Sequence, residues 1–569
     1  MQVILILCLV SVLFLIFITS HTNEEALNKN VYADLEVKLE ENKISGTGQE
    51  YNYIIVFNDE KSDDNGVYEN IADEAKNMRL SFKVRNKILA EDLESKPIII
   101  FTDTQISSYI SLPLIGDYIS SGGKVVFAGG IPENDNDSYL NPIWGIVEKG
   151  SRIQTKKFKI SDNFLPCGNA AFDYNGANIS MVLNLNKNVK VLMESEAGVP
   201  VVYSNTYNSG KVAVINGTFL ASKSSRGIFC AVLGEVQEQL IYPIIGTKSV
   251  YLDGFPIIYD GNDKNSFNLY GRSVEAFSRD VLWPELLSNS SRYGLKYTAN
   301  IIGIIPREYN IDFSNRRLLI YFSNQIIRNS GELGIALDLS GENGHLDKQA
   351  KGLNEYLRNC FSNYKFNNFS VLYGKADSDV LKVLSREFGE FQVIRGVYNG
   401  EADTQQIQNI ETDGEYINFP ATTSGYTIDN GTYFDYLSAL SEYGIISHSF
   451  NIEKLISANS EEESWYALKE AYEKLNRNFF LNAGWLKSAT LSEAARYAKA
   501  YRLLEMRTDT DQNGLNVKCN NFMKGQKFFF RSNQEVKKVE GGDFIKINSS
   551  YYVITAERPD FTVKTERNV

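Results

Sequence analysis

Short apolar runs that alternate with amphipathic segments constrain the fold of this 569-residue chain more than any other feature. The first runs are YNYIIVF, PIIIFTD and KVVFAG, at 51–57, 97–103 and 124–129. Helical periodicity fills 67–82 and 111–121 between them. Apolar strands joined by helices are typical of a parallel sheet buried on both faces. Residues 50–245 are therefore expected to form a Rossmann-like or flavodoxin-like α/β domain.

This first domain carries no recognisable phosphate-binding motif. Neither G-x-G-x-x-G nor G-x-x-x-x-G-K-S/T occurs in the sequence, so a nucleotide function is unsupported and the domain is left without an assigned ligand. Near its end, residues 200–217 (PVVYSNTYNSGKVAVING) predict a β-hairpin that turns at Asn208-Ser209-Gly210.

A second alternation of strands and helices begins near residue 249. Six strand-like runs lie at 249–258, 296–304, 332–339, 368–372, 391–394 and 444–450. Helical patterns lie at 273–293, 348–360, 376–388, 433–443, 461–475 and 490–504. Residues 246–510 are therefore expected to form a β/α barrel, complete or incomplete, with its chemistry at the carboxyl ends of the strands. Residues 511–569 alternate without helical signal and predict a small β domain.

The N-terminus reads as a membrane-type segment. No charged residue occurs between Val3 and Ile18. Residues 1–22 predict an uncleaved membrane anchor or, alternatively, a cleaved secretory signal. The polar residues 23–49 predict a tether, so the globular part is expected outside the cytoplasm, at the cell surface or in the periplasm, beside the membrane.

Composition excludes some classes of function. The net charge of −12 and the pI near 5.1 argue against nucleic acid as a partner. Five scattered cysteines give no disulfide framework or zinc knuckle. Only three histidines occur, and His21 follows the membrane-type segment, which leaves His345 and His448 for the globular part. Chemistry that needs clustered imidazoles therefore has few residues to use.

An ordered series of sequence blocks carries a family resemblance. The blocks are VAVINGTFLASKSSRG, VYLDGFP, DVLWPELLSNSSRYGLKYT, GELGI, FPATTSGY and YGIISH, between residues 212 and 448. Together with the sheet domain they resemble a bacterial family of membrane-linked proteins related to polysaccharide deacetylases, such as those of Pel exopolysaccharide biosynthesis. The resemblance implies a deacetylase-type β/α barrel and, in active members, metal-dependent removal of N-acetyl groups from a glycan.

The metal-binding residues of that family do not recur here. The family has Asp-Asp-Phe-Pro at the end of the first strand, where this chain has Asp253, Gly254, Phe255 and Pro256. The resemblance makes Asp253 the residual base and places glycine at a metal-ligand position. The two histidines that usually follow Gly-Glu-Ile-Gly-Leu are absent after GELGI.

The later blocks also lack residues that the resembling family has. Ala421 stands where the family has an arginine, and His448 remains without its companion histidine. His448 is interpreted either as a residue that contacts sugar or as a locally hydrogen-bonded core histidine. Phe255, Ser424 and Tyr426, which lie in the resembling blocks, are the expected substrate-binding residues.

Two hypotheses follow. The first is a degenerate deacetylase-like protein that needs no cofactor and binds or scaffolds a polysaccharide, with other proteins of an exopolysaccharide system as further partners. The second is an active N-deacetylase with a rearranged zinc-like site formed by Asp253, Asp338 and His345, with His448 nearby. Carboxylate pairs for glycoside cleavage, drawn from Asp253, Asp260, Asp263 or Glu332, are expected by chance in so acidic a chain.

Overall fold

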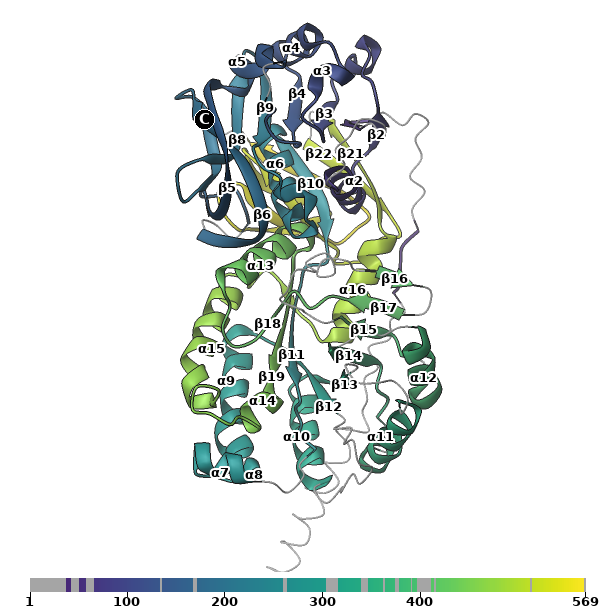
Figure 1. Ribbon diagram of the computed structural model, residues 1–569. Coiled ribbons are helices and arrows are strands. Elements are labelled where there is room, and N and C mark those ends of the chain that lie inside the picture. Colours follow the sequence, from purple (N-terminus) through teal and green to yellow (C-terminus); the bar gives the residue numbers. More distant parts are fainter. Residues whose placement is uncertain are drawn as a thin grey trace, which may run out of the picture.

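The computed structural model of the protein describes most of the chain beyond its N-terminal segment. The described residues are 37–41, 51–57, 66–133, 136–166, 171–258, 263–302, 316–338, 346–361, 364–373, 378–389, 391–396, 411–413, 416–511 and 514–566. The fold is α/β, as expected. A mixed sheet and the C-terminal strands lie in one half of Figure 1, and a second, mostly parallel sheet lies in the other half.

The first sheet has the strand order β2-β1-β3-β4-β9-β8-β7-β5-β6. Its parallel part comprises β2 (Phe82–Arg85), β1 (Tyr53–Val56), β3 (Ile98–Phe101), β4 (Lys124–Phe127) and β9 (Gly210–Ile215). Its antiparallel part comprises β8 (Pro200–Tyr207), β7 (Lys190–Ser195), β5 (Ile146–Ile160) and β6 (Ala171–Leu185). The expected Rossmann-like arrangement is confirmed, and a long antiparallel β5–β6 hairpin extends it.

Alternate residues of each parallel strand enter two separate cores, because successive side chains of a strand point to opposite faces. Ile55 packs on the side of α2 (Val67–Asn77) and α6 (Arg226–Val236). Its neighbour Ile54 packs with residues of α4 (Leu112–Ser120) and α5 (Asn141–Trp144). Burial on both faces explains why these strands are continuous apolar runs.

The predicted hairpin is confirmed. Strands β8 and β9 pair antiparallel up to Tyr207 and Gly210. Asn208 lies in the turn with φ +52°, a left-handed conformation that asparagine tolerates better than most residues.

The second sheet runs β17-β15-β14-β13-β12-β11-β19-β18, with all of these strands parallel. Its strands are β11 (Thr247–Asp253), β12 (Tyr297–Ile302), β13 (Glu332–Asp338), β14 (Asn368–Tyr373), β15 (Val393–Arg395), β17 (Tyr416–Phe419), β18 (Thr423–Ser424) and β19 (Ile445–Asn451). Two short strands extend it: β16 (Glu411–Asp413) beside β17, and β20 (Lys487–Ser488) beside β11.

One short segment connects the two ends of this sheet. β17 pairs with β15 at one end, and β18, only a few residues later, pairs with β19 at the other. Between them, Thr422 donates its backbone N–H to Ser447 of β19 at 2.8 Å. The parallel sheet is therefore barrel-like, with its ends brought together by the chain between Phe419 and Thr423.

The expected helices around this sheet are present. They are α8 (Val274–Phe277), α9 (Trp283–Tyr293), α11 (Leu346–Cys360), α12 (Ser378–Phe388), α13 (Asn430–Tyr443), α15 (Trp465–Phe480) and α16 (Leu491–Leu503). Three further helices, which the sequence patterns did not predict, are α7 (Lys264–Tyr270), α10 (Arg316–Arg328) and α14 (Ile452–Ile456). The single helix expected at 273–293 is instead interrupted by a π-helical stretch, Ser278–Leu282. Pro284 lies two residues after this stretch and has no N–H for the regular helical hydrogen bond, which accounts for the wider turn.

Two antiparallel sheets near the C-terminus pack on the first domain. One consists of β10 (Gln239–Ile244), β23 (Lys527–Ser532), β26 (Tyr551–Ala556) and β25 (Gly542–Lys546). The other consists of β21 (Glu505–Asp511), β22 (Gly514–Asn520), β27 (Asp560–Glu566) and β24 (Glu535–Glu540). Strand β10 therefore comes from the segment expected to end the first domain.

The predicted anchor at 1–22 lies outside the described residues. Within the described part of the chain, no helix is long and apolar enough to cross a membrane. Of the predicted tether, residues 37–41 are described, and Glu40 forms a two-way backbone bridge with Phe522. The described cysteines, Cys230, Cys360 and Cys519, are buried free thiols.

Candidate functional site

An ion pair lies at the centre of the barrel-like sheet. Asp253 ends β11, and Arg395 ends β15. Arg395 Nη2 lies 2.8 Å from both carboxylate oxygens of Asp253, and the two side chains are only 2% and 4% exposed. The guanidinium also lies 4.5 Å from the ring centroid of Tyr251. Because both charges are withdrawn from water, each depends on the other for electrostatic compensation.

Asparagines on the neighbouring strands complete this polar centre. Asn300 of β12 donates its amide to Asp253 Oδ1 at 2.8 Å. Gly334 of β13 lies between Asn300 and Asn368, and a Cβ at this position would come within 2.0–2.4 Å of their side-chain oxygens. A glycine is therefore required here to let two amide side chains fill the interior.

Backbone conformation explains the glycine next to Asp253. Gly254 has φ +78°, and a Cβ there would lie 2.6 Å from Cβ of Glu453. Both the left-handed conformation and the crowding oppose an aspartate at this position. Gly254 is thus fitted to its surroundings.

His448 is fully buried and hydrogen-bonded at both ring nitrogens. Its Nδ1 lies 2.7 Å from the hydroxyl of Thr423, and its Nε2 lies 2.9 Å from the carbonyl of Gly425. Its ring packs edge-on against Phe450 at 4.4 Å. Burial lowers the pKa of His448 to about 3, so the imidazole is neutral at physiological pH. In this arrangement it is a packed core histidine, and β11 places it level with Val250 rather than Asp253.

The expected substrate-binding residues lie at different depths. Phe255 is fully buried and packs against Trp283 and Phe322. Tyr426 is 9% exposed and donates its hydroxyl to the carbonyl of Asn451 at 3.0 Å. Ser424, on β18, is only half-buried. The structure therefore places Phe255 and Tyr426 in the core, and Ser424 nearest the solvent.

The remaining metal-site candidates, Asp338 and His345, cannot be placed relative to Asp253 from the described residues. His345 and the side chain of Asp338 lie outside the described residues, although the Asp338 backbone ends β13. Among the described residues no cluster of three His, Cys, Asp or Glu side chains forms a metal site. The donors present do not fit a divalent cation, because a guanidinium occupies the position beside both Asp253 oxygens where the cation would bind.

Other carboxylates considered for glycoside cleavage also lie apart. Glu332 begins β13, at the opposite end of the sheet from Asp253, and is hydrogen-bonded to Asn368 and Ser492. Asp263 accepts a backbone hydrogen bond from Val274 at 2.7 Å. Asp260 lies outside the described residues. Among the described positions, Glu332 and Asp253 therefore do not face one cavity.

Arg395 and Asn300 are the site residues that sequence reasoning missed. The strand expected at 391–394 stops one residue before Arg395, and the resemblance matches the family's arginine to Ala421, which is a buried apolar residue here. A usable signal existed, since Arg395 directly follows an apolar run and the carboxyl ends of barrel strands carry functional side chains.

Comparison with known proteins defines the family. The chain matches, over residues 10–553, the family described as uncharacterised protein conserved in bacteria (DUF2194). Because this match spans nearly the whole chain, the protein belongs to that family. No curated protein matches the chain.

Several solved structures show a slight likeness. A β-galactosidase from Bacillus circulans sp. alkalophilus matches with 14% identity and a TM-score of 0.24, covering 34% of this chain and 33% of that one. An exo-β-1,4-mannosidase from Opitutaceae bacterium strain TAV5 matches with 12% identity and a TM-score of 0.22, covering 30% and 31%. A β-galactosidase from Rahnella sp. R3 matches with 13% identity and a TM-score of 0.24, covering 34% of each chain. The chain thus spans about a third of these glycosidases, and a likeness of this size carries no argument about activity.

Proposed function

We propose that this protein is an extracytoplasmic, membrane-linked component of exopolysaccharide or cell-surface glycan metabolism, with a deacetylase-like barrel that no longer hydrolyses its glycan. In this role the protein binds or scaffolds a polysaccharide beside the membrane. The glycan connection is supported by the ordered blocks that resemble polysaccharide deacetylases.

The ion pair at the barrel centre carries the non-catalytic part of the proposal. A carboxylate that serves as general base must reach a water molecule or a substrate proton. Both oxygens of Asp253 are held by Arg395, and Asn300 donates to one of them as well. In the described structure the side chain is occupied in stabilising the sheet, and is not free to accept a substrate proton.

Metal analysis with an activity assay separates this proposal from an active deacetylase. The full chain, purified in detergent and incubated with zinc or nickel, is expected to retain no stoichiometric metal. It is also expected to release no acetate from an N-acetylated oligosaccharide, while still binding that oligosaccharide in a calorimetric titration.

Two substitutions make the result decisive. Stoichiometric metal with acetate release that is lost in Asp253→Asn, but kept in Asp379→Asn, would overturn the non-catalytic proposal. Asp379 is a suitable control because it is an exposed aspartate on α12, in an ion pair with the exposed Lys382. Absence of any oligosaccharide binding would overturn the glycan-binding role.

The location is tested independently. Cells that express the full chain are expected to carry it in the membrane fraction, with the globular part cleaved by protease added from outside the cytoplasmic membrane. Protection of the globular part until the cytoplasmic membrane is disrupted would place it on the other side and contradict the proposal.

A further inference from the structure

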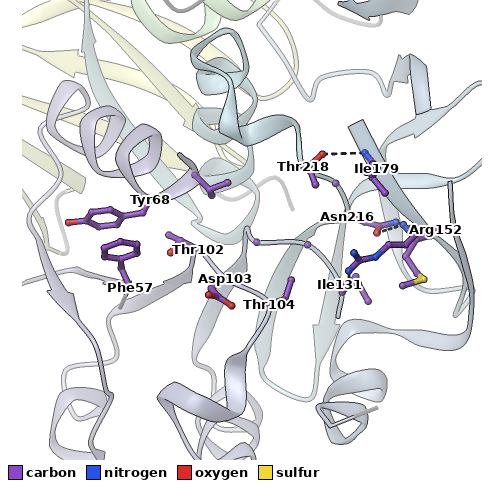
Figure 2. Close-up of a pocket in the computed structure, with 15 residues that line it drawn as sticks. Phe57, Tyr68, Thr102, Asp103, Thr104, Ile131, Arg152, Ile179, Asn216 and Thr218 are labelled. Carbon is purple, nitrogen blue, oxygen red and sulfur yellow. Dashed lines mark hydrogen bonds between the residues drawn. The ribbon is translucent and has the colours of Figure 1, made fainter. Parts of the chain in front are cut away.

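A polar crevice lies at the carboxyl edge of the parallel strands in the first domain. Its floor is formed by the residues that follow β1, β3, β4 and β9, and its volume is about 190 Å³. Figure 2 shows Asp103 and Thr104 in the middle of this crevice, with Phe57 and Tyr68 on one side and Arg152 on the other. This edge is where open α/β sheets bind their ligands.

Glycines allow the strand-end loops to approach one another closely. A Cβ at Gly129 would lie 2.5–2.6 Å from backbone atoms of Asp103. A Cβ at Gly130, where φ is +97°, would lie 3.8 Å from the carbonyl of Gly217 and 3.9 Å from the methyl group of Thr104. Three loops from different strands therefore meet at one point with their backbones exposed to the crevice.

Backbone hydrogen-bond donors without partners lie at this meeting point. Among the described residues, the backbone N–H groups of Thr104, Gly129, Gly130 and Gly217 have no hydrogen-bond partner. The carboxylate of Asp103 already accepts from the Gln105 N–H at 2.6 Å and from the Tyr109 hydroxyl at 3.2 Å. Converging backbone N–H groups of this kind form anion-binding concavities.

The β5–β6 hairpin supplies a cation beside these donors. Arg152 of β5 pairs through Nε with Glu133 at 3.2 Å and through Nη2 with the carbonyl of Ile131 at 3.2 Å. Its Nη1 has no partner within the described part of the chain, and the side chain is 41% exposed. The buried Asn178 of β6 accepts from the backbone N–H groups of Thr218 and Phe219, and thereby fixes the neighbouring wall.

An aromatic pair forms the opposite wall. The rings of Phe57 and Tyr68 stack with centroids 3.8 Å apart and planes 5° apart, and both side chains are partly exposed. Stacked aromatic side chains present a flat apolar surface to a ring. The cavity is smaller than the ~300–1,000 Å³ pockets that hold drug-sized ligands, so it suits a single small ring.

We propose that this crevice binds an acidic sugar unit of a glycan, with the sugar ring against Phe57 and Tyr68 and its carboxylate toward Arg152 and the unpaired N–H groups. The choice of a glycan as the ligand rests on the function proposed above. The acidic character rests on the Arg152 guanidinium and on the four backbone N–H groups that have no partner among the described residues. The glycan would then be recognised in the first domain and not in the barrel, where the sequence placed the substrate-binding residues.

Binding of a matched pair of trisaccharides to the full chain in detergent tests this site. Trigalacturonate is expected to bind at least about tenfold more tightly than the neutral galactotriose. Arg152→Gln is expected to weaken trigalacturonate binding by about tenfold or more, because a charge-assisted hydrogen bond is lost. Lys157→Gln is the control, since Lys157 is an exposed cation on the same strand that does not line the crevice.

The outcomes separate the site from the general function. Equal binding of the two trisaccharides, or equal affinities of Arg152→Gln and Lys157→Gln for trigalacturonate, would overturn the acidic-sugar site and leave the glycan-binding role intact. If neither trisaccharide binds while the N-acetylated oligosaccharide does, the inference fails and the proposed function stands. If no oligosaccharide binds, both fail.

Discussion

The first, mixed sheet and the barrel-like sheet place polar groups at the carboxyl ends of their parallel strands in opposite ways. At the centre of the barrel-like sheet, Asp253 and Arg395 are paired through Arg395 Nη2 and are almost completely buried, while Arg395 Nε and Nη1 are left without a hydrogen-bond partner in the described part of the chain. At the edge of the first sheet, Arg152 is exposed and several backbone donors have no partner within the described residues. The same architectural position is thus buried in one sheet and exposed in the other, so within the described residues the edge of the first sheet is the more accessible of the two to a ligand.

The largest expected effect comes from breaking the buried ion pair. Arg395→Met leaves the Asp253 carboxylate buried without its counter-charge, which costs about 3–5 kcal/mol of unfolding free energy. Urea denaturation of the variant measures this loss. The double variant Arg395→Met/Asp253→Leu is expected to regain most of it, since an apolar pair of similar volume can replace a buried ion pair. Equal stabilities of the single and double variants would show that the ion pair is not what holds this centre.

A smaller effect is expected from placing an aspartate next to Asp253, at Gly254. Gly254→Asp should lower the unfolding free energy by about 2–3 kcal/mol, because it adds the strain of a positive φ and a contact with Glu453. Gly271→Asp is the matched control, because Gly271 has φ +63° but no atom within 4 Å of its Cβ position. This variant should lose only the unfolding free energy due to backbone strain, about 1 kcal/mol. Equal losses in the two variants would remove the steric argument.

The buried histidine predicts a pH-dependent contribution to stability. The folded pKa of His448 is about 3, whereas the unfolded value is 6.5. Between these values the unfolded chain binds more protons, so this contribution falls as the pH falls below 6.5. From pH 8 to pH 5, the stability of the natural protein relative to His448→Gln should fall by about 2 kcal/mol.

The stability must be compared with that of His448→Gln, because other buried groups change the unfolding free energy with pH in the opposite direction. Burial raises the pKa of Asp435 to about 7 and also raises the pKa of Glu74, and such carboxyls favour the folded state at lower pH. Urea titrations of both proteins at several pH values give the difference. Parallel stability profiles would contradict a neutral, buried imidazole.

The smallest effect is expected at the open site. Arg152→Gln should change the unfolding free energy by less than about 0.5 kcal/mol, because its ion pair with Glu133 is largely exposed. The same denaturation assay used for Arg395→Met provides the direct comparison. A loss near that of Arg395→Met would mean that the crevice arginine serves the fold, and would remove the contrast between the two sheets.

The sequence predicts the elements well where burial dictates residue type. Runs such as 98–101 are buried on both faces and can be occupied only by apolar residues, so their strands are visible in the sequence. The π-helical stretch before Pro284 and the β10 strand are harder to foresee. The first depends on one missing N–H, and the second on a partner strand that lies far away in the sequence.

The candidate sites are less predictable because they depend on contacts across the fold. Asp253 is identifiable from its motif, but Arg395 meets it from a strand 142 residues later. The crevice has no sequence motif, since its donors are backbone groups whose availability depends on how three loops meet. The identities of the residues at such a site therefore do not reveal it, except that glycines are needed where the loops come close together.

Strand β10 has a consequence for how this chain is made. β10 is synthesised long before its partner strand β23. The Ile244 carbonyl likewise accepts a hydrogen bond from Gln526, which lies 282 residues further along the chain. Until synthesis ends, the edge of β10 is unpaired and open to association with other chains.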